Sequence, residues 1–446
     1  MDRVELFNGV LRFEKITFIV NAILIIHFIY DWYKLYKRTG ITLDFWTMSM
    51  SLIYLMPFLI MYPFSASYLN VMAVGENIIL IQQNIEVCYL IFLIGYACMY
   101  LGRYLFDRYQ NRTLIYTAFI KPFKLTLGRL FISSVSNVYT STIIFTVYLL
   151  ALLAILAYAK SLGAVDVRGV FQADPQIRAL YNFVLILSSV ISLVLIARVF
   201  QYNKRLDKIL LFLFFIATAF VGARAYLAQP IIYLFAFYVF FTMKGKINLL
   251  KVFGIGFFVL VIGTSLSLIR DGEFSIGKMA EGFGSSIFFG NSYSDLRDFA
   301  WVYGYWDKSL LFGKTYLAGF MSFVPSFLSD FRTQWAAGRF TAVTVGFDPL
   351  EHPGLRPGLF GESYFNFGVL GVVFLGTILG YAYRYIDYNI KLAAQNNDRL
   401  AAIATVVSTM FIFNLTITSG FFSIYVFLIV FVLASSFSKI LKVMSK

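Results

Sequence analysis

Apolar residues fill most of this chain in runs close to twenty residues long, and short polar connectors separate the runs. A helix of that length matches the roughly 30 Å hydrocarbon layer of a bilayer. Lipid offers the backbone no hydrogen-bond partners, so the runs are expected to be helices, and their length excludes a transmembrane barrel. Eleven spans are predicted, at about 16–34, 44–64, 80–105, 137–159, 179–201, 208–223, 225–242, 250–269, 366–385, 400–416 and 420–438. The pattern predicts an all-α integral membrane protein.

Basic residues gather in alternate connectors between these spans. Lys34, Lys37 and Arg38 follow the first span, and Lys439 and Lys442 follow the last. Cytoplasmic connectors of helical membrane proteins carry an excess of Lys and Arg, so six clusters on alternate connectors orient the chain. They predict an N-terminus outside, a C-terminus inside and the long 270–361 loop outside. We interpret the net charge of +14 as this orientation signal, with anionic lipid nearby, and not as a nucleic-acid surface.

Composition agrees with the spans and excludes several site types. Charged residues make up 13% of the chain, against about a quarter in soluble domains. Cys88 and Cys98 fall in one apolar run, so neither a disulfide framework nor a metal cluster is expected. The first run follows Glu5 and Glu14 and lacks a small-residue cleavage site, which predicts a retained helix and not a signal peptide.

The 270–361 loop is polar, aromatic and rich in arginine, in contrast to the rest of the chain. It divides the sequence into a scaffold (1–206), three spans (207–269), the loop itself and a C-terminal part (362–446). Short interfacial helices are expected within it. It holds Trp301, Trp306 and Trp335, three of the five tryptophans. Aromatic rings pack on the apolar faces of sugars, and they also anchor proteins at membrane interfaces, so both interpretations stay open.

Two arginines are predicted beside this loop. The sixth span, 209–222, is only roughly 21 Å long as a helix, so the turn that ends in Arg224 is expected to lie below the outer membrane surface. Arg270 closes the eighth span. Guanidinium groups bind phosphate oxygens in bidentate fashion and stay charged in apolar surroundings. The alternatives are an interfacial snorkelling side chain for Arg224 and an ordinary helix end for Arg270.

Further candidates lie in the loop and at the start of the ninth span. Possible substrate ligands are Arg297, Arg332, Arg339, Arg356, His352, Tyr364 and Asn366. Each arginine has the simpler interpretation of a surface charge, and a lone loop histidine is usually neither ligand nor base. Glu362 is a candidate acid or base, although a carboxylate at that position also complements a helix dipole. The 313–315 segment imitates a phosphate-binding loop, but Lys308 stands where that motif needs glycine. No Asp-x-Asp pair occurs, so no metal site is expected.

Four ordered motifs resemble those of the bacterial oligosaccharide repeat-unit polymerases, also called O-antigen polymerases. They are Gly222-Ala223-Arg224; Arg270; Leu311-Phe312-Gly313-Lys314-Thr315-Tyr316 ahead of Val324-Pro325; and Gly361-Glu362-x-Tyr364-x-Asn366-Phe367-Gly368-x-x-Gly371. The last motif is the most specific. Two positions depart from the family pattern: Ala223 stands where Ser is frequent, and Ser326 stands where Arg often follows the proline.

The resemblance implies a C-type membrane glycosyltransferase of the bacterial inner membrane that needs no metal and no cofactor. Two undecaprenyl-pyrophosphate-linked oligosaccharides would meet at the periplasmic face, and undecaprenyl pyrophosphate would leave. Arg224 and Arg270 would neutralise the pyrophosphate, and Glu362 would activate or orient the acceptor hydroxyl. A chain-length regulator is a candidate partner, and nucleic acid is not. An O-antigen ligase, a flippase or transporter of lipid-linked glycan and a non-catalytic assembly partner are the alternatives.

Overall fold

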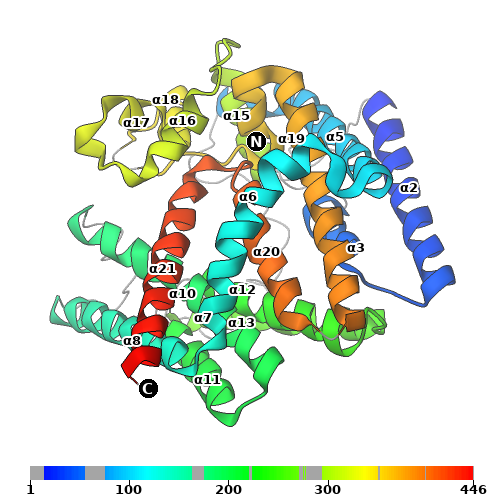
Figure 1. Ribbon diagram of the computed structural model, residues 1–446. Helices are drawn as coiled ribbons and strands as arrows, with labels where there is room; N and C mark the ends of the chain where they lie inside the picture. Colours follow the sequence, from blue (N-terminus) through cyan, green and yellow to red (C-terminus); the bar gives the residue numbers. More distant parts are fainter. Residues whose placement is uncertain are drawn as a thin grey trace. The chain divides into compact units, whose positions relative to one another are not determined.

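The computed structural model describes residues 15–55, 76–162, 175–219, 224–270, 275, 277, 294–349, 352–396 and 398–444, and the side chains of a few residues inside these ranges are not described. Every regular element within them is a helix, and the described ranges contain no strand. The predicted all-α class is therefore confirmed (Figure 1).

Helices cover all or part of each predicted span. They are α2 (Lys15–Thr39), α3 (Phe45–Met50) with η1 (Ser51–Leu55), α5 (Glu76–Tyr109), α8 (Val138–Ser161), α10 (Pro175–Tyr202), α11 (Arg205–Ala219), α12 (Arg224–Phe237) with η6 (Tyr238–Thr242), α13 (Leu249–Arg270), α19 (Gly358–Asn396), α20 (Arg399–Phe413) and α21 (Phe421–Met444). Five described helices are long and apolar enough to cross a membrane: Ile79–Arg112, Ser141–Ser161, Tyr181–Tyr202, Gly358–Asn396 and Thr418–Phe437. They are compatible with a membrane protein, while the count of eleven crossings and their orientation stay predictions.

Short helices build the described part of the long loop. They are α15 (Asp295–Tyr305), α16 (Lys314–Phe320), η8 (Met321–Phe323), η9 (Ser326–Leu328), α17 (Asp330–Trp335) and α18 (Ala337–Thr344). Helices α16, α17 and α18 pack on one another (Figure 1). The expectation of short helices in this loop is confirmed for residues 294–349, and their place at a membrane interface stays a prediction.

The chain forms two compact units. Unit 1 comprises Met1–Ile120, Ala280–Asp387 and Met410–Phe422, and unit 2 comprises Lys121–Met279, Tyr388–Thr409 and Ser423–Lys446. The predicted four-part division follows the order of spans along the chain. The units instead follow packing, which places most of the long loop in one unit with the first 120 residues and with α19 up to Asp387.

Helix α15 shows how the loop joins unit 1, because it packs along α5. A Cβ atom on Gly304 would lie 2.4 Å from Cγ of Leu80, so only a glycine lets the two helices approach this closely. The rings of Phe299 and Phe92 lie 5.9 Å apart, and Trp301 on the same helix is 2% exposed. Burial of large aromatic side chains fixes α15 against α5. This part of the loop is thus a packed layer of unit 1.

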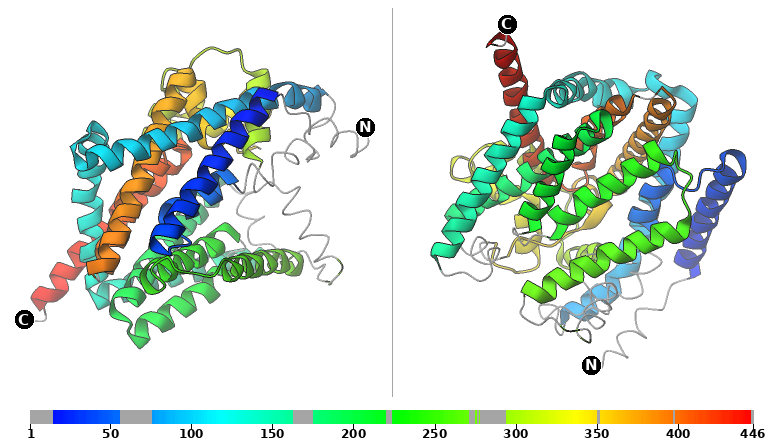
Figure 2. Two further views of the ribbon diagram at one scale, coloured as in Figure 1. Left: turned by 90° about the vertical axis from the view of Figure 1, so that its right-hand side faces the viewer. Right: turned by 90° about the horizontal axis from the view of Figure 1, so that it is seen from below.

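Helix α19 approaches α5 through small residues as well. A Cβ atom on Gly102 would lie 2.0 Å from the carbonyl oxygen of Thr377, and one on Gly380 would lie 1.9 Å from that of Met99. Glycines at such positions let two helix backbones touch, which is the usual means of helix association in lipid. Figure 2 shows the long helices of the chain from two further sides. The contact fixes the 377–380 part of α19 against α5.

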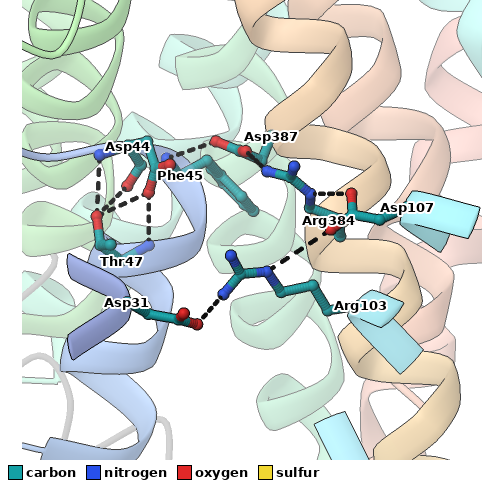
Figure 3. A network of polar contacts seen from close by, with 8 residues as sticks. All are labelled: Asp31, Asp44, Phe45, Thr47, Arg103, Asp107, Arg384 and Asp387. Carbon is teal, nitrogen blue, oxygen red and sulfur yellow. Dashed lines mark hydrogen bonds and ion pairs between the residues drawn. The ribbon is translucent and has the colours of Figure 1, made fainter. Parts of the chain in front are cut away.

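A network of charged side chains joins α2, α5 and α19 (Figure 3). Arg103 Nη1 donates to Asp31 Oδ2 at 2.6 Å, and Arg384 Nε donates to Asp107 Oδ1 at 2.7 Å. Arg384 Nη1 also donates to Asp387 Oδ2 at 2.6 Å. Each arginine therefore bonds a carboxylate on another helix, and such charge-assisted bonds are stronger than neutral ones.

The network continues from Asp387 into the start of α3. Asp387 Oδ1 accepts a hydrogen bond from the Phe45 backbone N–H at 3.2 Å. Asp44 caps α3 by accepting from the Thr47 backbone N–H at 2.8 Å. The charged groups come from the C-terminal halves of three helices whose spans are predicted to end on the same side of the membrane. Their meeting is compatible with that orientation.

We expect Asp387→Ala to destabilise the protein. The Asp387 carboxylate is 1% exposed and bonds both Arg384 and the Phe45 N–H, so its loss removes one acceptor from each of these donors. The expected loss in the free energy of unfolding is about 3 kcal/mol, at the low end for a broken buried ion pair because Arg384 keeps Asp107. The measurement is the melting temperature of the detergent-solubilised protein. Arg38→Ala, which removes an exposed charge from α2, is the control and should leave that temperature unchanged.

Candidate functional site

The site is built around the first turns of α19, where the 361–371 motif lies. Gly368 interrupts this helix with φ 62° and ψ −151°, a conformation that is essentially restricted to glycine. Residues 358–367 therefore form a short helix of their own, and the apolar span continues after the break. The requirement for glycine at position 368 therefore comes from the backbone conformation.

Glu362 lies on this short helix and is buried, with 3% of its surface exposed. Thr315 Oγ1 donates to its Oε1 at 2.7 Å. The Thr418 backbone N–H donates to Oε2 at 2.9 Å, and the Thr418 hydroxyl donates to Oε1. A buried carboxylate is costly unless hydrogen bonds replace water, and three donors supply that replacement here.

Asn366 lies one turn after Glu362 and extends the same network. Its Nδ2 donates to Thr315 Oγ1 at 2.7 Å and to the Glu362 carbonyl oxygen at 2.8 Å. Asn366 is fully buried, and its Oδ1 has no hydrogen-bond partner among the described residues. Buried acceptors of that kind are rare and are found at strained or functional positions. We name Thr315, Glu362, Asn366 and Thr418 the Glu362 cluster.

The cluster brings together three segments that are distant in sequence. Thr315 lies in the 311–316 motif, Glu362 and Asn366 lie in the 361–371 motif, and Thr418 begins η10 (Thr418–Gly420) between α20 and α21. Backbone hydrogen bonds join the two motifs directly: the Leu311 N–H donates to Phe365 O, and the Phe312 N–H donates to Asn366 O, each at 3.0 Å. Two motifs that the sequence shows as separate thus form one structure.

Tyr316 contacts the third segment, the turn between α20 and α21. Its hydroxyl donates to the Leu415 carbonyl oxygen at 2.9 Å, and its ring stacks on Phe367 at 5.9 Å between centroids. Burial raises the pKa of the Tyr316 phenol above its usual range, so the hydroxyl keeps the proton that it donates. The turn between α20 and α21 is therefore held at both Leu415 and Thr418.

A cavity of about 640 Å³ opens in the long loop of unit 1. Its lining combines aromatic rings with charged and polar groups: Tyr305, Trp306, Asp307, Ser309, Leu311, Asp330, Thr333, Gln334, Trp335, Arg339, Phe340, Val343 and Thr344. We call it the aromatic cavity. Its wall is shared with the 361–371 motif, because the rings of Trp306 and Phe340 lie 5.0 and 5.5 Å from that of Phe365.

Both signs of charge border the aromatic cavity. Arg339 provides a guanidinium, and Asp307 and Asp330 provide carboxylates. Hydrogen bonds from the Ser309 hydroxyl and N–H lower the pKa of Asp307, which keeps that carboxylate ionised. Lys314 Nζ lies 4.2 Å from the centre of the Trp335 ring, a cation–π contact that fixes the indole at the cavity edge.

Two of the predicted loop arginines bond aspartates of α15. The Arg297 guanidinium is 4% exposed and donates to Asp298 Oδ1 at 2.7 Å. Arg356 is half-exposed, with Nε 3.7 Å from Asp295 Oδ1, and its backbone N–H donates to Asp298 Oδ2 at 3.5 Å. The Arg356 contacts hold the segment before α19 against α15, whereas the Arg297 contact lies within α15. Binding of substrate by either arginine stays a prediction.

The other loop candidates have local partners. Arg332 is half-buried and donates to the Val324 carbonyl oxygen. His352 Nδ1 accepts from the Gly354 N–H at 3.0 Å, and burial lowers the pKa of its imidazole, which favours the neutral ring that this bond requires. Tyr364 is half-buried and packs on Phe299, 6.0 Å away between centroids. Of the substrate-binding candidates, Arg339 lines the aromatic cavity and Asn366 belongs to the Glu362 cluster.

The two predicted pyrophosphate arginines have side chains that the structure does not describe. Arg224 is the first residue of α12 and Arg270 the last residue of α13, and the side chains of both lie outside the described residues, as do Gly222 and Ala223. Both arginines belong to unit 2 and Glu362 to unit 1. Their convergence on one substrate stays a prediction.

The sequence did not single out Thr418, and it named Thr315 only as part of a motif. The sequence holds a signal for Thr418, because residues 414–420 form a polar connector between two apolar runs and Thr418 lies in that connector. Within the described ranges, no group of three His, Cys, Asp or Glu side chains is placed to hold a metal ion. Comparison with protein-family models, curated proteins and solved structures found no match.

We expect Glu362→Ala to free the turn between α20 and α21. The Thr418 N–H donates to the Glu362 carboxylate, so its hydrogen exchange should become at least about tenfold faster when that acceptor is lost. The measurement is hydrogen–deuterium exchange of peptides that cover 412–422. Thr126→Val, which alters an exposed threonine of unit 2, should leave the exchange of these peptides as in the wild type. Unchanged exchange in Glu362→Ala would contradict the described cluster.

Proposed function

We propose that this chain is a membrane glycosyltransferase that polymerises undecaprenyl-pyrophosphate-linked oligosaccharide repeat units at the periplasmic face of the bacterial inner membrane. The observation that carries the proposal is the Glu362 cluster. It joins the 311–316 and 361–371 motifs, which resemble those of repeat-unit polymerases, at the wall of an aromatic cavity in the same unit. A resemblance in sequence order alone would not require these motifs to meet.

The aromatic cavity supports a glycan as substrate. Trp306, Trp335 and Phe340 supply flat apolar surfaces for sugar rings, while Asp330, Gln334 and Arg339 supply acceptors and donors for hydroxyl groups. A membrane anchor needs exposed aromatic rings and no such polar partners. The mixed lining therefore favours the glycan interpretation over the anchor for the rings that face the cavity.

We assign Glu362 the role of a positioning residue. A general base must reach the proton that it removes, either directly or through one water. The Glu362 carboxylate is 3% exposed and accepts three hydrogen bonds from Thr315 and Thr418. Of the two roles predicted for it, orientation of the acceptor site fits this environment better than proton removal.

The proposed reaction forms a bond between an acceptor hydroxyl oxygen and the anomeric carbon of the growing chain. The bond from that carbon to the pyrophosphate oxygen breaks, and the hydroxyl proton leaves to a base or to water. Negative charge then grows on undecaprenyl pyrophosphate. Arg224 and Arg270 would stabilise this charge, since preorganised guanidinium groups act most strongly where water is excluded. The predicted orientation places both at the outer side, the same side as the long loop.

The first test is chain growth in Arg224→Ala and Arg270→Ala. With purified protein and lipid-linked repeat units, we expect products no longer than a single repeat, against a ladder for the wild type. Arg→Lys at either position should also reduce chain length, because an ammonium group cannot replace the bidentate guanidinium. Arg108→Ala, an exposed arginine of α5, is the control and should give a normal ladder.

Long chains from either alanine variant would contradict the role of that arginine. Transfer of a single glycan to lipid A core by the wild type, without a ladder, would identify a ligase instead. Movement of lipid-linked glycan across vesicles without new glycosidic bonds would identify a flippase.

The second test concerns the aromatic cavity. Trp335→Ala removes one indole from the lining, and we expect the KM for lipid-linked repeat units to rise about tenfold with a smaller change in kcat. Phe327→Ala is the matched control, because this aromatic ring of the same loop is 84% exposed and lies outside the cavity lining. Equal KM values for the two variants would remove the cavity from the glycan site.

A further inference from the structure

A second cavity lies in unit 2, outside the site described above. Its volume is about 390 Å³, and its walls come from η5 (Lys124–Gly128), α7 (Arg129–Ser136), the C-terminal end of α19 and the helix α20. The lining consists of Lys124, Leu125, Gly128, Arg129, Ile132, Asn389, Leu392, Ala393, Asn396, Asp398, Ala401, Ala404 and Thr405. Two cationic side chains, two side-chain amides and several apolar groups therefore face one space.

The local backbone explains why the two cations share this cavity. Residues Lys124–Gly128 form a π-helix, in which residue i bonds residue i+5. Lys124 and Arg129 are five positions apart, so the wider turn brings them to one face. In an α-helix, with 3.6 residues per turn, the same spacing would direct them to different faces. Short π-helical segments occur frequently at functional positions.

Cationic side chains outnumber carboxylates in the lining of this cavity. The 110–136 segment carries Arg112, Lys121, Lys124 and Arg129 and contains no Asp or Glu. Asp398 on the opposite wall is the one carboxylate among the lining residues, against the two cations Lys124 and Arg129. The side of the cavity formed by η5 and α7 is therefore positive.

Apolar side chains continue from the cations along the rim. Leu125 is 44% exposed, Ile132 37% and Leu392 41%. Side chains of this kind face lipid in a membrane protein, whereas a site for a small soluble anion needs no apolar rim. The combination of a positive wall and an exposed apolar rim matches a molecule with a phosphate head and acyl chains.

We propose that this cavity binds an anionic phospholipid. The phosphate lies at Lys124 and Arg129, the Asn389 and Asn396 amides face the polar part of the headgroup, and the acyl chains cover Leu125, Ile132 and Leu392. The predicted orientation places the 106–136 connector at the cytoplasmic side, where anionic headgroups attract clustered Lys and Arg. The site is independent of the proposed glycosyl transfer.

The test is native mass spectrometry of the full-length protein titrated with phosphatidylglycerol and, separately, with phosphatidylcholine. We expect preferential binding of phosphatidylglycerol, with affinity falling about fivefold in Lys124→Ala and in Arg129→Ala and further in the double variant. Arg129→Lys should keep most of the affinity because it keeps the charge. Lys121→Ala removes an exposed lysine of the same connector that does not line the cavity, and it should bind as the wild type does.

Three results would overturn the proposal. They are equal binding of the two lipids, unchanged phosphatidylglycerol affinity in the double variant, and equal losses in Lys121→Ala and Arg129→Ala. Inorganic phosphate and glycerol phosphate, added at millimolar concentration, separate the two sources of a phosphate group. Displacement of the lipid by either would identify a site for a soluble phosphate. The melting temperature of each variant shows whether it is folded. If an alanine variant does not fold, Arg129→Lys still tests the proposal, because a large loss of phosphatidylglycerol affinity in that variant would contradict a site that depends on charge.

Discussion

A carboxylate taken out of water is the constraint on which the rest of unit 1 depends. Glu362 is stable where it lies only because hydroxyl and N–H donors surround it, and those donors come from two other segments. Satisfying one side chain therefore fixes the start of α19, the beginning of α16 and the turn before α21 at one point. The same arrangement shapes the aromatic cavity, because Leu311 lines that cavity and its N–H bonds the Phe365 carbonyl oxygen.

The apolar part of α19 is bounded by polar contacts at both ends. Gly368 and Arg384 are sixteen residues apart, which corresponds to about 24 Å of helix and approaches the hydrocarbon thickness of a bilayer. One end meets the Glu362 cluster, and the other meets Asp107 and Asp387. Contacts through Gly102 and Gly380 lie between them. Lipid can stabilise none of these polar groups, so each must find its partner in the protein, and this requirement aligns the helix.

The sequence predicted what depends on local pattern. Apolar runs located the helices, and composition marked the long loop, because both are properties of neighbouring residues. Contacts over long separations were beyond it: Glu362 bonds residues 47 and 56 positions away, and nothing in either segment names its partner. The packing of α15 on α5 was missed for a similar reason, since the loop was expected to form short interfacial helices and not part of the core. The π-helical turn at Lys124 was also unforeseen, because apolar periodicity does not reveal a change in helix type.

Gly368 gives the short helix that holds Glu362 a different axis from that of the span after it. A continuous helix would pass every tilt or rotation of the membrane segment directly to the carboxylate. A kink at this single residue, with φ 62° and ψ −151°, lets the two parts of α19 follow different axes. Gly368 thus lets the apolar span and the polar end of α19 each take the direction that its own surroundings require.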